Sequence, residues 1–244
     1  ISVPSTFSVR KNVTVTIVGQ GTSITQTTNG ERAFYIEDPV HETYPDALLV
    51  DSKNYGIHVE FQDVTFHDIG DNSASSTAVS NSGLDGGGVY ASHLRDLRFD
   101  QCVFNGNRGR LGGGLYAVNT TYLLLETTSF VNNQAVSGGG AFLRDVEFAH
   151  VRSSTFTGNA AVMEGGGLVM EGCNTTSVYI TQFSSNSAGE HGGGLAVHRS
   201  QLSTGLTSSS FASNSASYGS ALYVRKSSDW TFTSNSFSLN TCLL

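Results

Sequence analysis

Short apolar segments alternate with polar turns along most of this chain. Residues 13–18 and 57–61 alternate apolar and polar side chains, which is the pattern of a strand with one buried face. Later segments such as residues 115–118 and 122–125 are apolar, only a few residues long, and bounded by turn residues. No segment keeps a 3.6-residue period over the length of a helix. The pattern therefore predicts an all-β protein of many short strands.

Two motifs recur in one register and show that the strands belong to a repeat. Triple glycines recur every 26 or 27 residues, starting at Gly86, Gly112, Gly138, Gly165 and Gly192, with a degenerate copy at Gly219. A Phe-x-x-Asn motif keeps the same register in six copies: Phe104 with Asn107, Phe130 with Asn133, Phe156 with Asn159, Phe183 with Asn186, Phe211 with Asn214, and Phe237 with Asn240. A repeat of this length without a helix is typical of a β-solenoid.

One repeat unit cannot bury its own apolar side chains, so successive units must stack. Stacking about 4.8 Å apart pairs every strand with its copies above and below. We expect a right-handed, single-stranded parallel β-helix of about eight or nine coils, each of 26–28 residues. The repeated Phe should point inward and stack on its neighbours. The repeated Asn should form a ladder of amides inside a turn, which satisfies polar groups that would otherwise be buried unpaired.

The regular motifs begin only at the first triple glycine, so the chain divides into unequal parts. Residues 1–66 are expected to form irregular first coils of the same domain, with Phe66 in the position of the repeated Phe. Residues 67–85 should form an inserted loop, and residues 37–48 a second one, because both are rich in turn residues. Residues 86–244 should form the regular coils. The chain starts without Met and ends abruptly, so we expect these coils to continue in a longer protein.

The tandem motifs resemble those of a known family. Phe104-Asn-Gly-Asn107 before Gly112-Gly-Gly-Leu115, and the matching pair at Phe156 and Gly165, are similar to the repeats of chlamydial polymorphic outer-membrane proteins. The resemblance covers about residues 86–240, although Gly-Gly-Gly-Leu replaces the family's Gly-Gly-Ala-Ile. It implies a pectin-lyase-like β-helix, secreted or on the cell surface, with an adhesive or structural role.

Composition excludes some classes of partner. Charged residues make up 14% of the chain, with 13 Lys and Arg against 20 Asp and Glu, and the longest basic cluster is Arg225-Lys226. Nucleic acid requires a cationic surface, so we expect no nucleic-acid partner. No apolar run approaches the roughly 18 residues of a transmembrane segment.

The three cysteines, Cys102, Cys173 and Cys242, leave two interpretations open. They are either buried free thiols, or one disulfide plus a cysteine that pairs outside this segment. None forms a C-x-x-C pair, so a zinc site is not expected.

Three N-glycosylation patterns begin at Asn12, Asn119 and Asn174. Asn119 lies seven residues after Gly112 and Asn174 nine after Gly165, so both fall in the turn after the glycine strand. They should project from one edge of the solenoid, which favours a glycosylated, extracellular or cell-surface protein.

Because pectin-lyase-like folds include polysaccharide lyases and hydrolases, catalytic motifs need separate attention. Glu190-His191-Gly192 and Arg225-Lys226 echo two motifs of polygalacturonases, but the paired aspartates that hydrolysis needs are missing. We therefore assign no catalytic residue. Asp63, Asp68 and Asp71, near His67, are the best calcium candidates, although a solvated loop is the simpler and preferred explanation.

Three tyrosines follow the glycines at the same coil position: Tyr90, Tyr116 and Tyr223. They form either an exposed aromatic stripe or part of the internal packing.

The sequence thus predicts a non-catalytic structural or adhesive module. Its partners should be other domains, or copies of the same protein, that meet the open ends of the β-helix. The alternatives are a polysaccharide lyase or hydrolase, and a carbohydrate-binding module. No cofactor is expected, with calcium as the one open possibility.

Overall fold

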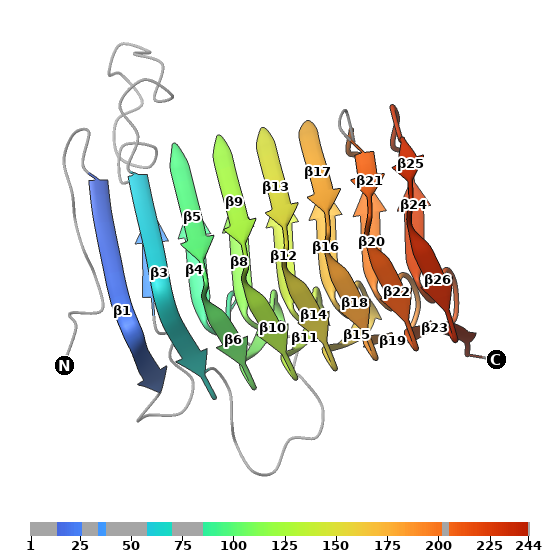
Figure 1. The fold of residues 1–244 in the computed structure, drawn as a ribbon, viewed down its shortest axis with the longest axis horizontal. Coiled ribbons are helices and arrows are strands. Elements are labelled where there is room, and N and C mark those ends of the chain that lie inside the picture. The colour runs from blue at the N-terminus through green and yellow to red at the C-terminus, as the bar shows by residue number, and fades with distance from the viewer. Residues whose placement is uncertain (1–13, 26–33, 38–57, 70–84, 202–204, 244) are drawn as a thin grey trace.

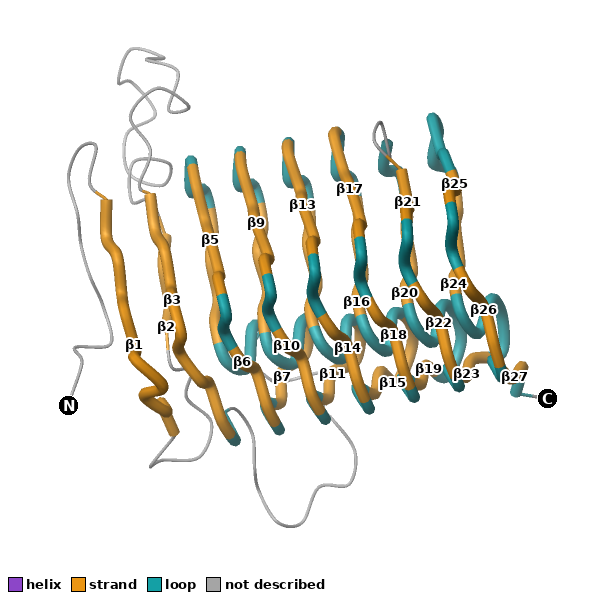
Figure 2. Tube along the Cα trace, viewed as in Figure 1, coloured by secondary structure: helices purple, strands orange, loops and turns teal. Residues whose placement is uncertain are grey.

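The computed structural model describes residues 14–25, 34–37, 58–69, 85–201 and 205–243, all of which lie in strands or in the short corners between them. The strands stand in a row from β1 at the N-terminal side to β26 at the C-terminal side (Figure 1). Short corners join them, and the described residues contain no helix (Figure 2). The prediction of an all-β solenoid is confirmed.

Three parallel sheets run along the stack. Sheet A has 14 strands and holds two strands from each regular coil. Its strands are β1 (Thr14–Thr25), β3 (His58–His67), β5 (Asp96–Asp100), β6 (Val103–Asn105), β9 (Tyr122–Glu126), β10 (Ser129–Val131), β13 (Phe148–Arg152), β14 (Thr155–Thr157), β17 (Thr175–Tyr179), β18 (Gln182–Ser184), β21 (Gly205–Thr207), β22 (Ser210–Ala212), β25 (Phe232–Thr233) and β26 (Ser236–Ser238).

Each coil adds one strand to each of the other two sheets. Sheet B, which follows the glycines, contains β2 (Phe34–Glu37), β4 (Val89–Ser92), β8 (Leu115–Val118), β12 (Ala141–Arg144), β16 (Leu168–Glu171), β20 (Leu195–His198) and β24 (Leu222–Arg225). Sheet C contains β7 (Arg108–Leu111), β11 (Gln134–Ser137), β15 (Ala160–Glu164), β19 (Ser187–Ala188), β23 (Ser215–Ala216) and β27 (Thr241–Cys242).

The described residues hold six complete coils, each with one strand in sheet B, two in sheet A and one in sheet C. This is fewer than the eight or nine expected, because β1, β2 and β3 supply only parts of earlier coils. The long strand β3 pairs with both β5 and β6, so the irregular first coils join the same sheet as the regular ones. The expected loops fall mainly on residues 38–57 and 70–84, which lie outside the described residues.

Each described corner between sheets, and each bend between the two sheet A strands of a coil, contains a residue with a positive φ that turns the chain. At the corner between sheets C and B this residue is the first glycine of the triplet, for example Gly112 with φ of 65°. The second glycine has a different role, because a Cβ on Gly113 would lie 2.3 Å from the carbonyl oxygen of Gly139 in the next coil. The triplet therefore combines a left-handed turn with a close approach of two backbones.

Inward-facing side chains form one continuous core along the stack. Phe104, Leu115 and Leu123 are typical members, fully buried on three different strands of neighbouring coils. Strands of sheet A alternate buried and partly exposed residues, as in β10 and β14, because only one face of the sheet meets the core. Burial of each large apolar side chain contributes about 1.5–3 kcal/mol.

Candidate functional site

The repeated Phe residues form an unbroken stack through the core. Phe66 begins it, and the ring of Phe104 lies 4.6 Å from it. Consecutive rings from Phe104 to Phe237 lie 4.7 to 5.1 Å apart between centroids and within 9° of parallel. The stack that the sequence predicts is therefore present, and Phe66 takes the place expected of it. Its regular members are Phe104, Phe130, Phe156, Phe183, Phe211 and Phe237.

The repeated Asn residues form a second ladder beside the Phe stack. In Asn133 both the backbone N–H and the side-chain amide donate to Oδ1 of Asn159, each at 3.0 Å. Its Nδ2 also donates to the carbonyl oxygen of Phe104 at 2.9 Å. The ladder ends upstream at Ile69, whose backbone N–H donates to Oδ1 of Asn107. Ile69 thus joins the ladder through its backbone alone.

The same bonds continue without a break to the last coil. Nδ2 of Asn159 donates to Oδ1 of Asn186 at 3.0 Å, and Nδ2 of Asn186 donates to Oδ1 of Asn214 at 3.0 Å. Nδ2 of Asn214 donates to Oδ1 of Asn240 at 2.9 Å. Asn186 and Asn214 are fully buried, as expected, whereas Asn240 is partly exposed because the structure describes no later coil to cover it. The six repeated Asn residues therefore occupy equivalent positions, and only the last departs from the burial that the sequence predicts.

A third ladder was not predicted from the sequence. It lies two residues before each Phe and consists of Cys102, Thr128, Ser154, Thr181, Ser209 and Asn235. The Thr128 hydroxyl donates to the carbonyl oxygen of Phe99 at 3.1 Å, and the Thr128 backbone N–H donates to Ser154 Oγ at 3.1 Å. The constant spacing of small polar residues before Phe is the signal that could have revealed it.

The cysteines are free thiols, and two of them replace hydroxyls in such ladders. Cys102 donates its thiol to the carbonyl oxygen of Phe61 at 3.3 Å. Cys173 occupies an equivalent place at another corner, where its backbone N–H donates to Ser200 Oγ at 3.0 Å. Burial raises the pKa of the Cys102 thiol to about 11 and that of the Cys173 thiol to about 12. Cys242 is exposed, so the interpretation as buried free thiols holds for two cysteines of the three.

Two of the predicted glycosylation residues are exposed at one kind of corner. Asn119 lies between β8 and β9, and Asn174 lies between β16 and β17. Both corners join sheet B to sheet A. Asn12 lies outside the described residues.

The two described calcium candidates, Asp63 and Asp68, lie at separate turns of one coil. Asp63 lies at the bend within β3 and Asp68 at the corner that follows β3, and both have a φ of 53°. Asp68 is exposed and pairs with Nδ1 of His67 at 3.0 Å. Asp71 falls outside the described residues. Within the part that the structure describes, no three His, Cys, Asp or Glu side chains are grouped to hold a metal ion.

His191 forms isolated β-bridges to the neighbouring coils, in line with sheet C, and its ring packs against aromatic rings. Its ring centroid is 4.3 Å from that of Tyr223 and 5.4 Å from that of Tyr218. It stands in register with Glu164 of the preceding coil, as the repeat predicts.

The tyrosines of the glycine strand point outward from sheet B. Tyr116 is nevertheless buried, because it packs against Phe142 of the next coil. Tyr90 is partly buried and packs against Tyr116. These side chains are thus neither a fully exposed stripe nor part of the inner core.

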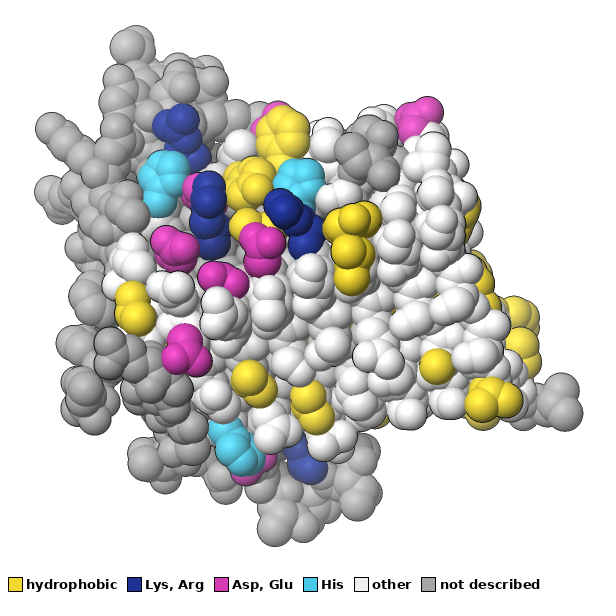
Figure 3. All heavy atoms as spheres, viewed as in Figure 1, with side chains coloured by type: hydrophobic (Ala, Val, Ile, Leu, Met, Phe, Trp, Pro, Cys, Tyr) yellow, Lys and Arg dark blue, Asp and Glu magenta, His cyan; other side chains and the backbone are white. Residues whose placement is uncertain are grey.

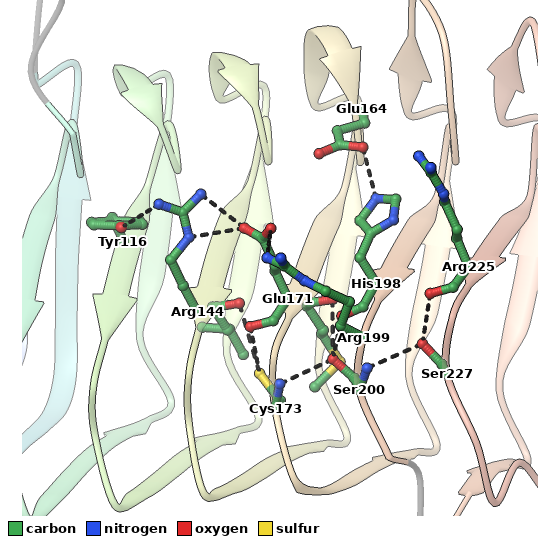
Figure 4. A network of polar contacts seen from close by, with 12 residues as sticks. Tyr116, Arg144, Glu164, Glu171, Cys173, His198, Arg199, Ser200, Arg225 and Ser227 are labelled. Carbon is green, nitrogen blue, oxygen red and sulfur yellow. Dashed lines mark hydrogen bonds and ion pairs between the residues drawn. The ribbon is translucent and has the colours of Figure 1, made fainter.

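A network of ion pairs covers this outer face of sheet B (Figure 4). Arg144 donates from Nε to Oε2 of Glu171 at 2.8 Å and from Nη1 to the Tyr116 hydroxyl at 3.4 Å. Arg199 pairs with the other oxygen of Glu171. Nearby, Glu164 contacts Nε2 of His198 at 2.7 Å. Burial raises the pKa of the Tyr116 phenol.

The chemistry available to this network follows from its pairing. Hydrogen bonding from His198 lowers the pKa of the Glu164 carboxyl, so Glu164 is ionised at neutral pH. A general acid at that pH needs a raised pKa instead. Glu171 lies between two guanidinium groups, and each of its oxygens pairs with one of them. The arrangement is suited to clamping neighbouring coils together through charge-assisted contacts.

Within the described residues, no helix has the length and apolar character needed to cross a bilayer. Searches of curated proteins and of solved structures found no match to this chain. A family model described as "right handed beta helix region" matches residues 11–183, which is more than half of the chain. The match supplies the right-handedness that we expected for this solenoid. The parallel coils and the match together place this chain in the right-handed β-helix family.

Proposed function

We propose that this chain is a non-catalytic structural or adhesive module of an extracellular, cell-surface or filament protein. The observation that carries the proposal is the continuity of the Phe and Asn ladders through every regular coil to the last one. Such ladders make each coil a rigid template for the next. The similarity of the paired motifs to passenger repeats of chlamydial polymorphic outer-membrane proteins supports the same role.

The last coil offers a surface on which another coil can stack. Its strands β24, β25, β26 and β27 each pair with a strand on one side only among the described residues. Phe237, the last ring of the stack, is 51% exposed, and Leu239 is 82% exposed. Unpaired parallel edges beside exposed apolar side chains favour strand addition. The proposed partners are other domains, or copies of this protein, that continue the coils.

The exposed corners support the extracellular location. Asn119 and Asn174 project from the same type of corner, where a glycan would not disturb a sheet. Expression in a eukaryotic secretory pathway tests this point, because each site should add one glycan that peptide N-glycosidase removes. Replacing each Asn by Gln should remove one glycan. An unglycosylated secreted chain would count against the extracellular proposal.

Stacking at the last coil is tested by concentration-dependent assembly. The chain should form end-to-end particles, seen by negative-stain electron microscopy at increasing concentration. Phe237→Arg should abolish them, because it places a charge on the stacking surface, whereas Gln182→Arg on an exposed side position should not. Particles that persist in Phe237→Arg would overturn this part of the proposal.

The enzyme and carbohydrate-binding alternatives are tested on the same protein. The chain is incubated with a panel of acidic and neutral polysaccharides, with and without calcium. Reducing ends and unsaturated products are measured, and retention on each immobilised polysaccharide is recorded. Turnover would contradict the non-catalytic proposal, and retention without turnover would favour a carbohydrate-binding module.

A further inference from the structure

A second feature stands apart from the ladders and from the last coil. The outward side chains of β5, β9 and β13 form a three-by-three array on one face of sheet A, which we call the grid. Charged and apolar side chains gather on this part of the face in Figure 3, whereas much of the surface toward the C-terminal coils is uncharged. The equivalent outward residues of the following coils include Ser177 and Thr207.

The grid is held in a fixed arrangement by its own contacts. Arg98 pairs with Asp96 through Nε at 2.9 Å, and its guanidinium lies 5.2 Å from the centre of the Tyr122 ring. His150 contacts Ser177 Oγ at 2.7 Å. A surface whose side chains are already ordered loses little entropy when it binds a partner.

The centre of the grid is apolar, one edge row carries two aromatic residues, and the opposite edge row is fully charged. Leu124 lies at the centre and is 8% exposed, while the outer corner residue Phe148 is 38% exposed. One row across the three strands reads Asp100, Glu126 and Arg152. Asp100 and Glu126 are like charges in direct register, which is unfavourable unless a cation lies near them. Arg152 lies 3.6 Å from Glu126, at the far end of the row.

This row is complementary to itself when it is reversed. We propose that the grid binds a second copy of this chain, around a two-fold axis parallel to β9. That axis places β5 of one copy against β13 of the other. Asp100 then faces Arg152 of the second copy, twice by symmetry, and Leu124 faces its own equivalent. Charge complementarity and the apolar centre that the two copies share therefore favour a second copy of this chain as the partner of the grid.

The remaining contacts set the strength of the association. Arg98 faces His150 of the second copy, and burial lowers the pKa of His150, so this pair is not a repulsion of two cations at neutral pH. The two Glu126 carboxylates meet near the axis, and Asp96 faces the Phe148 ring of the second copy. Both contacts oppose binding, whereas Tyr122 faces its own equivalent. The grid measures roughly 14 Å by 16 Å, from strand spacings and residue rises. That is well below the roughly 800 Å² per partner of a stable complex, so the association is weak.

Charge-reversal variants test the proposal. Their self-association is measured by sedimentation velocity at concentrations up to several hundred micromolar. The chain is used unglycosylated, because Asn119 lies at the corner before β9. Asp100→Arg and Arg152→Asp should each weaken self-association about tenfold, since each creates like-charge pairs. An equimolar mixture of these two variants should associate at least as tightly as the unaltered chain, because both facing pairs of the row are then opposite in charge. Glu126→Gln should strengthen association.

Controls separate this contact from the stacking of coil ends. Gln182→Arg and Phe237→Arg should leave lateral association unchanged, and thermal unfolding should show that all variants fold. No association of the unaltered chain in this range would overturn the proposal. A mixture no tighter than the single variants would also overturn it, even if the end-to-end stacking of the proposed function were observed.

Discussion

Asn133 donates two hydrogen bonds to a single atom of Asn159, the side-chain oxygen Oδ1 in the next coil. Both residues are fully buried. Each Asn from Asn133 to Asn214 therefore accepts from the backbone and side chain of the Asn in the coil before it, and it donates in the same way to the Asn in the coil after it. Neighbouring coils become a single hydrogen-bonded unit through this arrangement.

Replacing Asn159 by Leu should destabilise the protein by about 3 kcal/mol or more. The change keeps the volume but leaves two buried donors of Asn133 without their acceptor, and each such loss costs about 1–3 kcal/mol. Urea unfolding followed by circular dichroism measures the effect. Gln182→Ala, at an exposed position of β18, is the control and should change stability by less than about 0.5 kcal/mol. Equal effects of the two changes would contradict the role assigned to the ladder.

Phe156→Ala should cost about 3–5 kcal/mol, because it opens a cavity between two stacked rings. Phe148→Ala removes the same ring from a position that is 38% exposed and should cost far less. Both are measured by thermal and urea unfolding at low protein concentration. A similar loss in the two variants would show that the stack does not dominate core stability.

The cysteines should differ sharply in reactivity toward a thiol reagent at pH 8. Cys242 is exposed and should react within minutes. Cys102 and Cys173 should react only after unfolding, since burial raises their thiol pKa values to about 11 and about 12. Mass spectrometry of the labelled peptides in the folded and denatured chain identifies the sites. Rapid labelling of Cys173 in the folded chain would be inconsistent with its place in the ladder.

Acid should destabilise the protein in two separate pH ranges. Burial lowers the pKa of His150 below the ordinary 6.5, so the unfolded chain binds a proton more readily and stability falls as pH drops through that value. Hydrogen bonding from His198 lowers the pKa of Glu164 below 4.5, so its contribution is present above that pH and is lost as pH falls through the lowered value. The free energy of unfolding is measured as a function of pH for each variant. In His150→Gln it should lose its pH dependence only in the range just below pH 6.5, and in Glu164→Gln only in the range below pH 4.5.

Sequence reasoning was most successful where one residue type recurs at a fixed spacing. The positions of Phe104 and Asn107 face the interior in each copy before the last, so their period alone predicts the register of the coils and the content of two ladders. Even Phe66 could be placed, although its partner position holds Ile69. The reason is physical, because a buried position accepts few residue types and repetition makes the restriction visible.

The grid on the outer face of sheet A was not predicted. Asp96, Tyr122 and Phe148 share one register but not one chemistry, so their alignment gives no repeating signal. The ladder through Cys102 and Thr128 was missed for a related reason, since thiol, hydroxyl and amide side chains all satisfy the same turn.

The close approach at Gly113 also limits how the length of this chain can change during evolution. An insertion inside the triplet would place a side chain where the Gly113 and Gly139 backbones meet. A bulge elsewhere in the coil tolerates an insertion, as the register shift between β11 and β15 shows. A whole repeat can be duplicated or deleted without that penalty, since the new ends match the old ones. Related chains should therefore differ in length by whole repeats and at loops and bulges away from the glycine triplet, with the cross-section of the rod preserved.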